Sequence, residues 1–327
     1  MIKQAMKKII TLLALTITFS MNAQVSTNST SPTGTYASAM GNGTTASGNE
    51  STAMGYDTTA SGEASTAMGY STTATAQSST AMGRSTTASG TNSTAMGNGS
   101  TASGTGSLAI GLSSTASDSY SIAIGRDITS SGSHSVAMGF GTTASGNRST
   151  ATGAYTTASD FGSTVIGQYN SSGSSVTNNA TSFSTSNTAF VIGNGTNNSN
   201  KSDAFKVMFN GDTTVSNDLT VSGDVNISSD ARLKSNIVSL GATLSKLLLI
   251  DGKSYEIKGK QKIGVLAQEI QEVFPELVSE DDNEMLSVNY QGLVPVLINA
   301  LKEQESKIIH QQTQIDELKE LVNNLIN

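Results

Sequence analysis

The chain has no cysteine and no tryptophan, and only three prolines among its 327 residues. Without cysteine, neither disulfides nor thiolate metal sites are available. Charged residues make up 13% and aromatic residues 5%, which is too few for a conventional globular protein of this length. The net charge is −7 and the basic residues form no cluster, which argues against nucleic acid or an anionic membrane as a partner. Backbone ladders, burial of small side chains or association between chains must therefore hold the fold together.

Long apolar runs are also scarce, and the longest extends from Ile9 to Phe19. It follows three lysines, precedes the small residue Ala23, and is too short to span a bilayer. These features predict a signal peptide over residues 1–23. No later run is long enough for a membrane helix. We therefore expect an exported protein, extracellular or at the cell surface, whose mature chain has no integral membrane span.

Glycine, serine, threonine and alanine dominate the section that follows, and they repeat every 14 residues, as in "STAMGYDTTASGEASTAMGYSTTATA". A second glycine comes seven residues after most of the first set, with Ala76, Asp118 and Asp160 as exceptions. A disordered linker has no need to keep such a register, so we expect stacked coils. The glycines that keep the register are Gly41, Gly55, Gly69, Gly83, Gly97, Gly111, Gly125, Gly139, Gly153 and Gly167.

The glycine spacing predicts that each 14-residue unit forms two short strands and two corners. Glycine or aspartate at a corner suits a left-handed backbone angle. Apolar and small side chains alternate along the first strand, with Leu108 and Ile110 on one face and Ala109 on the other. We expect the large side chains to fill a narrow interior. The same is expected of their counterparts in the next repeats, Ile122, Ile124, Val136 and Met138.

Such coils bury little by themselves, so their stability requires stacking and association with other chains. The repeated units "STAMG", "SLAIG" and "SIAIG" resemble the head repeats of YadA-type trimeric adhesins over residues 34–169. The resemblance implies a left-handed parallel β-roll, three rolls side by side, and a surface-displayed head that binds a host or environmental ligand. A short linker, residues 24–33, precedes this head.

Residues 170–228 break the period but keep strand-like alternation, with Phe205, Val207 and Phe209 on one face. Asn-Gly and Ser-Gly turns separate the segments. We expect a β-rich neck here.

A further domain is predicted over residues 229–327, where the composition changes. The last 98 residues carry 10 of the 18 basic and 15 of the 25 acidic residues. The pattern predicts an α+β domain: a helix, a hairpin around "YEIKGKQKIGVLA", a helix ended by Pro275, and a long helix from Leu286 with Pro295 in its first turn.

That last helix predicts a coiled coil over about 292–327, with polar Gln304 and Gln311 at two seam positions. Heptads alone do not fix the number of chains, but the repeat head suggests a homotrimer. An isolated amphipathic helix is the alternative. The apolar seam residues are Val294, Leu297, Leu301, Ile308, Ile315, Leu318, Val322 and Leu325.

The stretch "SSDARLK" at the domain boundary holds a candidate catalytic pair. A lysine can act as the base for a serine if burial or nearby positive charge makes it neutral. Ser229 would be the nucleophile and Lys234 the base, supported by Asp230 and by Arg232 as a neighbouring cation or an oxyanion ligand. The alternative is that Ser229 and Asp230 merely cap a helix. No cofactor or metal is implied.

"SDARLK", "IGVLAQEI", "VFPELV" and "SVNYQGLVPVLINALKEQ" together resemble the self-cleaving chaperone domain of phage endosialidase tailspikes and the myelin regulatory factor, over residues 229–322. The resemblance implies a domain that trimerises, assists folding of the fibre ahead of it, and then releases itself with the Ser229–Lys234 dyad. This is protease activity for a single turnover.

The bond that is cut flanks Ser229. Attack of its hydroxyl on the Ser228 carbonyl passes through a five-membered ring, whereas attack on its own carbonyl needs a strained four-membered ring. We therefore favour the Ser228–Ser229 bond, with Ser229–Asp230 as the alternative. The dyad acts within one chain or between chains.

Two other functions fit the same sequence. One is a structural trimeric adhesin whose last domain stays attached as a permanent trimerisation foot. The other is a phage-type tail fibre that recognises a host surface, although the export signal counts against it.

Overall fold

The computed structural model describes residues 29–171, 179–281 and 284–326, so the predicted signal peptide at 1–23 lies outside the described residues. The chain divides into two compact units, Met1–Ser222 and Gly223–Asn327. None of the described helices is long and apolar enough to cross a membrane.

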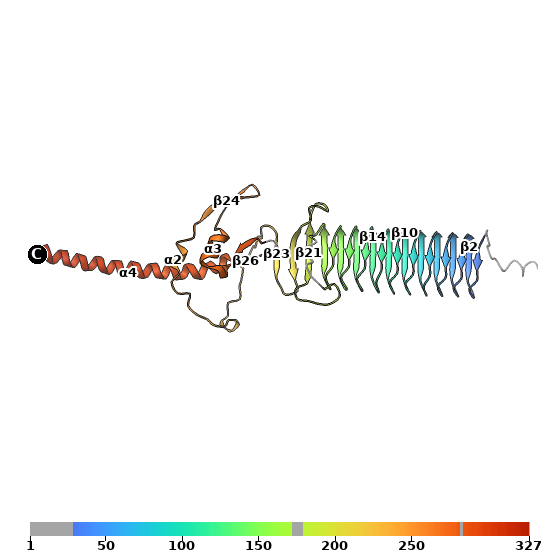
Figure 1. Cartoon of the computed structure of the whole chain (residues 1–327), viewed down its shortest axis with the longest axis horizontal. Coiled ribbons are helices and arrows are strands. Elements are labelled where there is room, and N and C mark those ends of the chain that lie inside the picture. Colours follow the sequence, from blue (N-terminus) through green and yellow to red (C-terminus); the bar gives the residue numbers. More distant parts are fainter. Residues whose placement is uncertain (1–28, 172–178, 282–283, 327) are drawn as a thin grey trace, which may run out of the picture. The chain divides into compact units, whose positions relative to one another are not determined.

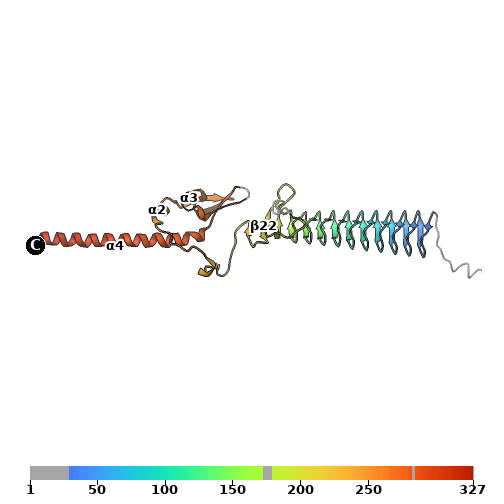
Figure 2. The ribbon, with the colours of Figure 1, turned by 60° about the horizontal axis from the view of Figure 1, so that its bottom comes forward.

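The first unit is a parallel β-solenoid, as predicted, with coils stacked in one direction (Figures 1 and 2). Each coil contributes one strand to each of two sheets. The shorter strands are β1 (Ser31–Pro32), β3 (Thr45–Ala46), β5 (Thr59–Ala60), β7 (Thr73–Ala74), β9 (Thr87–Ala88), β11 (Thr101–Ala102), β13 (Thr115–Ala116), β15 (Thr129–Ser130), β17 (Thr143–Ala144) and β19 (Thr157–Ala158). The longer strands are β2 (Ser38–Asn42), β4 (Thr52–Tyr56), β6 (Thr66–Tyr70), β8 (Thr80–Arg84), β10 (Thr94–Asn98), β12 (Leu108–Leu112), β14 (Ile122–Arg126), β16 (Val136–Phe140), β18 (Thr150–Ala154) and β20 (Thr164–Gln168).

Equivalent residues of successive coils are direct partners in these ladders. In β12 and β14, for example, Ala109 pairs with Ala123 and Gly111 with Gly125. The 14-residue period therefore places equivalent positions in columns along the solenoid, and a shift by one residue would turn every side chain to the wrong face.

The interior of the solenoid is filled by alanine, which corrects the expectation that large side chains fill it. Ala109, Ala123 and Ala137 have no exposed surface. Leu108 and Ile110 point to the outer face instead and are only partly covered. The same holds for Ile122, Ile124, Val136 and Met138. Two sheets joined by such short corners lie close together, so alanine, serine and threonine fill most of the space between them, with Ile128 and Val165 as larger exceptions.

The ten glycines in register have the predicted left-handed backbone, with φ from +95° to +136°. They lie at the fourth residue of the longer strands, however, and not at corners. A Cβ atom there would lie 1.8–2.3 Å from the carbonyl oxygen of the equivalent glycine in the next coil. Glycine is thus required both by its backbone angle and by the close approach of the next coil.

The second set of glycines does not adopt the left-handed angle, so that part of the corner prediction is wrong. Positive φ occurs two residues after both sets of glycines, at residues such as Asp57, Ser71, Asn92 and His134. Asparagine and aspartate tolerate this conformation better than other residues with a side chain.

Replacement of Gly111 by alanine should lower the melting temperature of the solenoid, because the new methyl group adds a clash to about 1–3 kcal/mol of backbone strain. Gly99→Ser is the matched control. The open position of Gly99 has a φ of +68°, and its equivalents Ser85 and Ser113 adopt φ of 53° and 54°. Thermal unfolding of the full chain followed by circular dichroism measures both effects. Equal losses in the two variants would contradict the assignment.

Beyond β20 the longer sheet continues through β21 (Thr188–Asn194), β22 (Asp203–Met208) and β23 (Thr213–Val215). Strand β21 pairs with β20 in parallel. Strand β22 pairs antiparallel with β21, and β23 pairs antiparallel with β22, at the end of the sheet. Buried Asp160 accepts a hydrogen bond of 2.8 Å from the backbone of Thr188 through Oδ2. It thereby fixes the start of β21 on the last coil, and its burial raises the pKa of its carboxyl group. Residues 216–228 contain no strand, so the predicted β-rich neck ends early.

The second unit begins with the 3-10 helix η2 (Ala231–Leu233) and contains α2 (Leu244–Leu247), a hairpin of β24 (Lys253–Ile257) and β25 (Lys260–Gly264), and α3 (Ala267–Val273). The predicted order of helix, hairpin and helix before Pro275 is therefore correct. The remaining elements are η3 (Pro275–Leu277), β26 (Val278–Glu280), β27 (Leu286–Val288), η4 (Tyr290–Gly292) and α4 (Leu293–Ile326).

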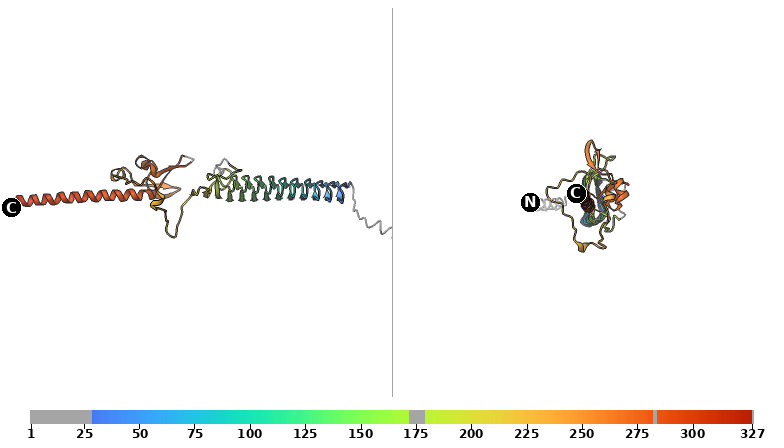
Figure 3. Two further views of the ribbon diagram at one scale, coloured as in Figure 1. Left: turned by 90° about the horizontal axis from the view of Figure 1, so that it is seen from below. Right: turned by 90° about the vertical axis from the view of Figure 1, so that its left-hand side faces the viewer.

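The long helix α4 begins at Leu293, seven residues later than predicted from Leu286. Residues Leu286–Val288 form β27, which pairs with β26. Pro295 lies in the first turn as expected, where its missing N–H leaves no hydrogen bond unmade. The helix continues past the other elements of its unit as a single rod (Figure 3).

A small core joins α3 to the beginning of α4. Ile270, Phe274 and Val296 are buried in it, and partly buried Leu247 and Leu293 pack around them. The later turns of α4 contribute nothing to this core, because Ala300 is the last buried residue of the helix.

Candidate active site

The two predicted dyad residues lie within hydrogen-bonding distance of each other. The Nζ atom of Lys234 donates to the Oγ atom of Ser229 over 2.7 Å. A base in this position is able to take the serine proton, which is the first step of nucleophilic catalysis.

A single turn of 3-10 helix, η2, brings these side chains together. Asp230 is the N-cap, and its Oδ1 atom accepts a 2.9 Å hydrogen bond from the backbone N–H of Arg232. The N–H of Lys234 closes the turn on the carbonyl of Ala231. The alternative in which Ser229 and Asp230 cap a helix is therefore correct only for Asp230, because the Ser229 hydroxyl faces Lys234.

Arg232 pairs with Asp230 through both nitrogens of its guanidinium edge. Its Nε atom lies 3.0 Å from Oδ1, and its Nη2 atom lies 2.6 Å from Oδ2. Hydrogen bonds from Arg232 lower the pKa of the Asp230 carboxyl group, and the same pair raises the pKa of the guanidinium. The positive charge of Arg232 is therefore directed at Asp230.

The site is open to solvent in the single chain. All residues from 210 to 242 are exposed, including Ser229 and Lys234. Apolar side chains in this stretch are exposed as well: Leu233 to 74% and Val238 to 83%. Uncovered apolar side chains of this number are typical of surfaces that associate with another molecule.

A carboxylate on α4 fixes the downstream end of this open stretch, and no sequence pattern predicted it. The Oε1 atom of Glu303 accepts hydrogen bonds from the backbone of Thr243 and from that of Leu244, the latter over 3.2 Å. The Thr243 hydroxyl also donates to the carbonyl of Val296 over 3.0 Å. The start of α2 is thereby tied to α4. The hydrogen bonds from Thr243 and Leu244 lower the pKa of Glu303.

Loss of the Glu303 charge should destabilise the second unit at neutral pH. A lowered carboxyl pKa means that the folded state favours the ionised form, so this stabilisation is present above the ordinary value of 4.5 and disappears as the pH falls through the lowered value. Glu303→Gln should therefore unfold at lower temperature than the wild type at neutral pH and at the same temperature in acid. Glu305→Gln is the control, and an equal loss in both variants would contradict the role of Glu303.

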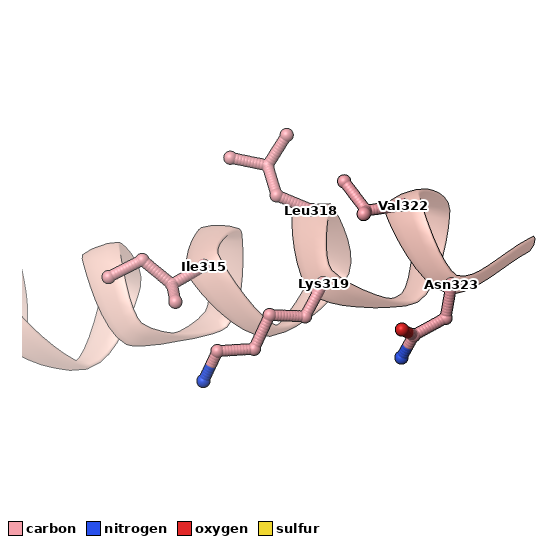
Figure 4. A pocket seen from close by; sticks show the side chains of 5 residues that line it. All are labelled: Ile315, Leu318, Lys319, Val322 and Asn323. Carbon is pink, nitrogen blue, oxygen red and sulfur yellow. The ribbon is translucent and has the colours of Figure 1, made fainter. Parts of the chain in front are cut away.

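The predicted coiled-coil seam forms an uncovered stripe along α4. In the single chain its eight apolar residues are 46–85% exposed. Ile315, Leu318 and Val322 line a shallow hollow with Lys319 and Asn323, and Leu318 and Val322 extend from the same side of the helix (Figure 4).

Comparison with known families identifies both parts of the chain. Residues 229–279 match the sequence model of the family described as chaperone of endosialidase. The YadA head domain repeat matches in overlapping segments from residue 33 to residue 127 and in a further segment at residues 130–156. No curated protein matches the chain. The two resemblances found in the sequence are thus confirmed: the chain combines YadA head repeats with a segment similar to the endosialidase chaperone, whose match begins at Ser229. The head match indicates a surface or extracellular location.

Proposed function

We propose that this chain, built from YadA head repeats and an endosialidase-type chaperone domain, is an exported homotrimeric fibre. Its last domain assembles the three chains and then releases itself at Ser229. The observation that carries the proposal is the 2.7 Å contact between Lys234 Nζ and Ser229 Oγ at the first residue of the chaperone match.

The outer face of the solenoid supports association of the heads. The third residue of the longer strands forms a column of large apolar side chains on this face, interrupted at Thr152 in β18. Met40, Met54 and Met138 are each 37% exposed, and Ile166 is 38% exposed. The column also includes Met68, Met82, Met96, Ile110 and Ile124. An apolar column of this length favours association, and in the proposed trimer two further copies of the same column would cover it.

The tail supports early assembly. The exposed seam of α4 belongs to a helix that forms from local contacts, whereas three solenoids need many contacts that are distant in sequence. The coiled coil would therefore bring the chains together before the heads align.

The chemistry is an acyl shift followed by hydrolysis. Lys234 takes the hydroxyl proton of Ser229, and the oxygen adds to the carbonyl carbon of Ser228 through a five-membered ring. The bond from that carbon to the Ser229 nitrogen then breaks, and the nitrogen receives a proton. Residues up to 228 are left as an ester on Ser229. Water then hydrolyses the ester and frees the serine hydroxyl.

Assembly would supply what the isolated site lacks. Burial favours the neutral amine of a lysine over the ammonium, and only the neutral amine accepts a proton. Residues around the dyad are exposed in one chain, so neighbouring copies are the groups that would cover them. Cleavage would then follow assembly. A dyad formed between chains satisfies the same requirement.

Ser229→Ala and Lys234→Ala should each abolish release of the C-terminal fragment without preventing trimer formation, because they remove the nucleophile and the base. Denaturing gels of the expressed full chain show the fragment, and sedimentation shows the trimer. Ser235→Ala and Lys260→Ala are matched controls that should still be cut. N-terminal sequencing of the fragment should begin at Ser229, whereas a start at Asp230 would identify the other bond.

Two results would contradict this scheme. A wild-type trimer that stays uncut indicates a permanent trimerisation foot, which removes the protease half of the proposal. A chain that remains monomeric with its tail attached removes the assembly half.

A further inference from the structure

The distance that the chain has to bridge between the dyad residues suggests a role for the two residues inside the turn. Five extended residues would place the Cα atoms of Ser229 and Lys234 roughly 17 Å apart. The observed 2.7 Å contact between their side chains therefore requires a reversal of the backbone. The reversal is η2, closed by hydrogen bonds from Leu233 N–H to Asp230 and from Lys234 N–H to Ala231, each 3.1 Å long.

This turn is not part of a packed core. Within the described residues, every position from 210 to 242 is exposed. One turn of helix is unstable by itself, because nucleation fixes several backbone angles for few hydrogen bonds. The stabilising contacts come from Asp230, which caps the turn and also binds the guanidinium of Arg232 through two nitrogen atoms.

We infer that Asp230 and Arg232 are positioning residues, which hold the turn that presents Lys234 to Ser229 and take no part in the proton transfer. This inference rests on the proposed self-cleavage. In the described part of the chain the Asp230 carboxylate contacts Arg232 and not Lys234, so Asp230 does not act as a third member of a triad. This inference also replaces the expectation that Arg232 is a cation acting on the lysine, because the guanidinium of Arg232 is paired with Asp230.

The two roles predict different kinetics. A looser turn lowers the fraction of chains with Lys234 in contact with Ser229, so the rate falls by the same factor at every pH, by about 100-fold for a displacement near 1 Å. An electrostatic role would change the pKa of the base and move the midpoint of the pH–rate profile. Removal of a cation that acts on the lysine, for example, would move that midpoint to higher pH.

The test uses the full-length chain, assembled at low pH, where a protonated amine does not act as a base, and then shifted to a series of higher pH values. Denaturing gels give the rate of fragment release at each pH. We expect Asp230→Ala to be about 100-fold slower than wild type with an unchanged midpoint. Asp230→Asn and Asp230→Ser should recover much of the rate, because both side chains cap a helical turn without a charge. Arg232→Gln should be slower, again with an unchanged midpoint.

Two outcomes would overturn the inference. One is a shifted midpoint in Asp230→Asn or Arg232→Gln, and the other is cleavage of Asp230→Ala at the wild-type rate. Sedimentation confirms that each variant is trimeric. If Asp230→Ala does not assemble, the midpoints of Asp230→Asn and Asp230→Ser decide between the roles. Ser229→Ala in the same assay separates the two levels: if it still releases the fragment, the proposed cleavage fails, not merely the role of the turn.

Discussion

The close contact between successive coils of the solenoid is the constraint on which the rest of the protein depends. Backbones approach so closely that a Cβ atom at Gly111 would lie 1.8 Å from the next carbonyl oxygen. The same compactness favours small side chains such as Ala109 in the interior, and Ile128 is one of few larger residues there. An interior of methyl groups buries little apolar surface per residue, so a single solenoid has a weak hydrophobic core. The large side chains, such as Ile110, lie on the outer face, where only another molecule is able to bury them.

This arrangement makes the head dependent on the tail in the proposed assembly. Three parallel solenoids have to align many equivalent coils, and a repeating surface offers a false alignment at every shift by one coil. A helix such as α4 has no such ambiguity if its seam contains polar interruptions, and Gln304 and Gln311 are two of them. The tail would therefore fix both the number and the register of the chains before the heads associate.

Much of this architecture was predictable from the sequence because it depends on local chemistry. The 14-residue register predicted the solenoid and the left-handed glycines, and the turn signals predicted the hairpin of β24 and β25. The direction of the side chains was not predictable. Alternation places Leu108 and Ala109 on opposite faces but does not say which face is inside, and the assumption that larger means buried was wrong. That decision depends on the distance between the two sheets.

The candidate active site likewise combines features that local sequence predicts with features that it does not. The spacing of Ser229 and Lys234 suggested a pair, but the role of Asp230 depends on hydrogen bonds that spacing does not reveal. Glu303 gave no signal at all, because its partners Thr243 and Leu244 lie about 60 residues earlier in the chain. Contacts between distant segments are set by the packing of α2 against α4, and no local pattern encodes them.

In the proposed scheme, cleavage after assembly makes the assembly irreversible. Before the cut, head and tail share one chain, so dissociation and reassembly remain linked in a single equilibrium. After the cut at Ser229 in the proposed scheme, the fibre no longer carries the element that aligned it. A separated chain would then have no route back to the correct register, and persistence of the fibre would be governed by its rate of unfolding and not by the free energy of unfolding. Such a fibre needs a high barrier to dissociation, which the proposed association of three outer faces would provide because contacts along many coils would have to break together.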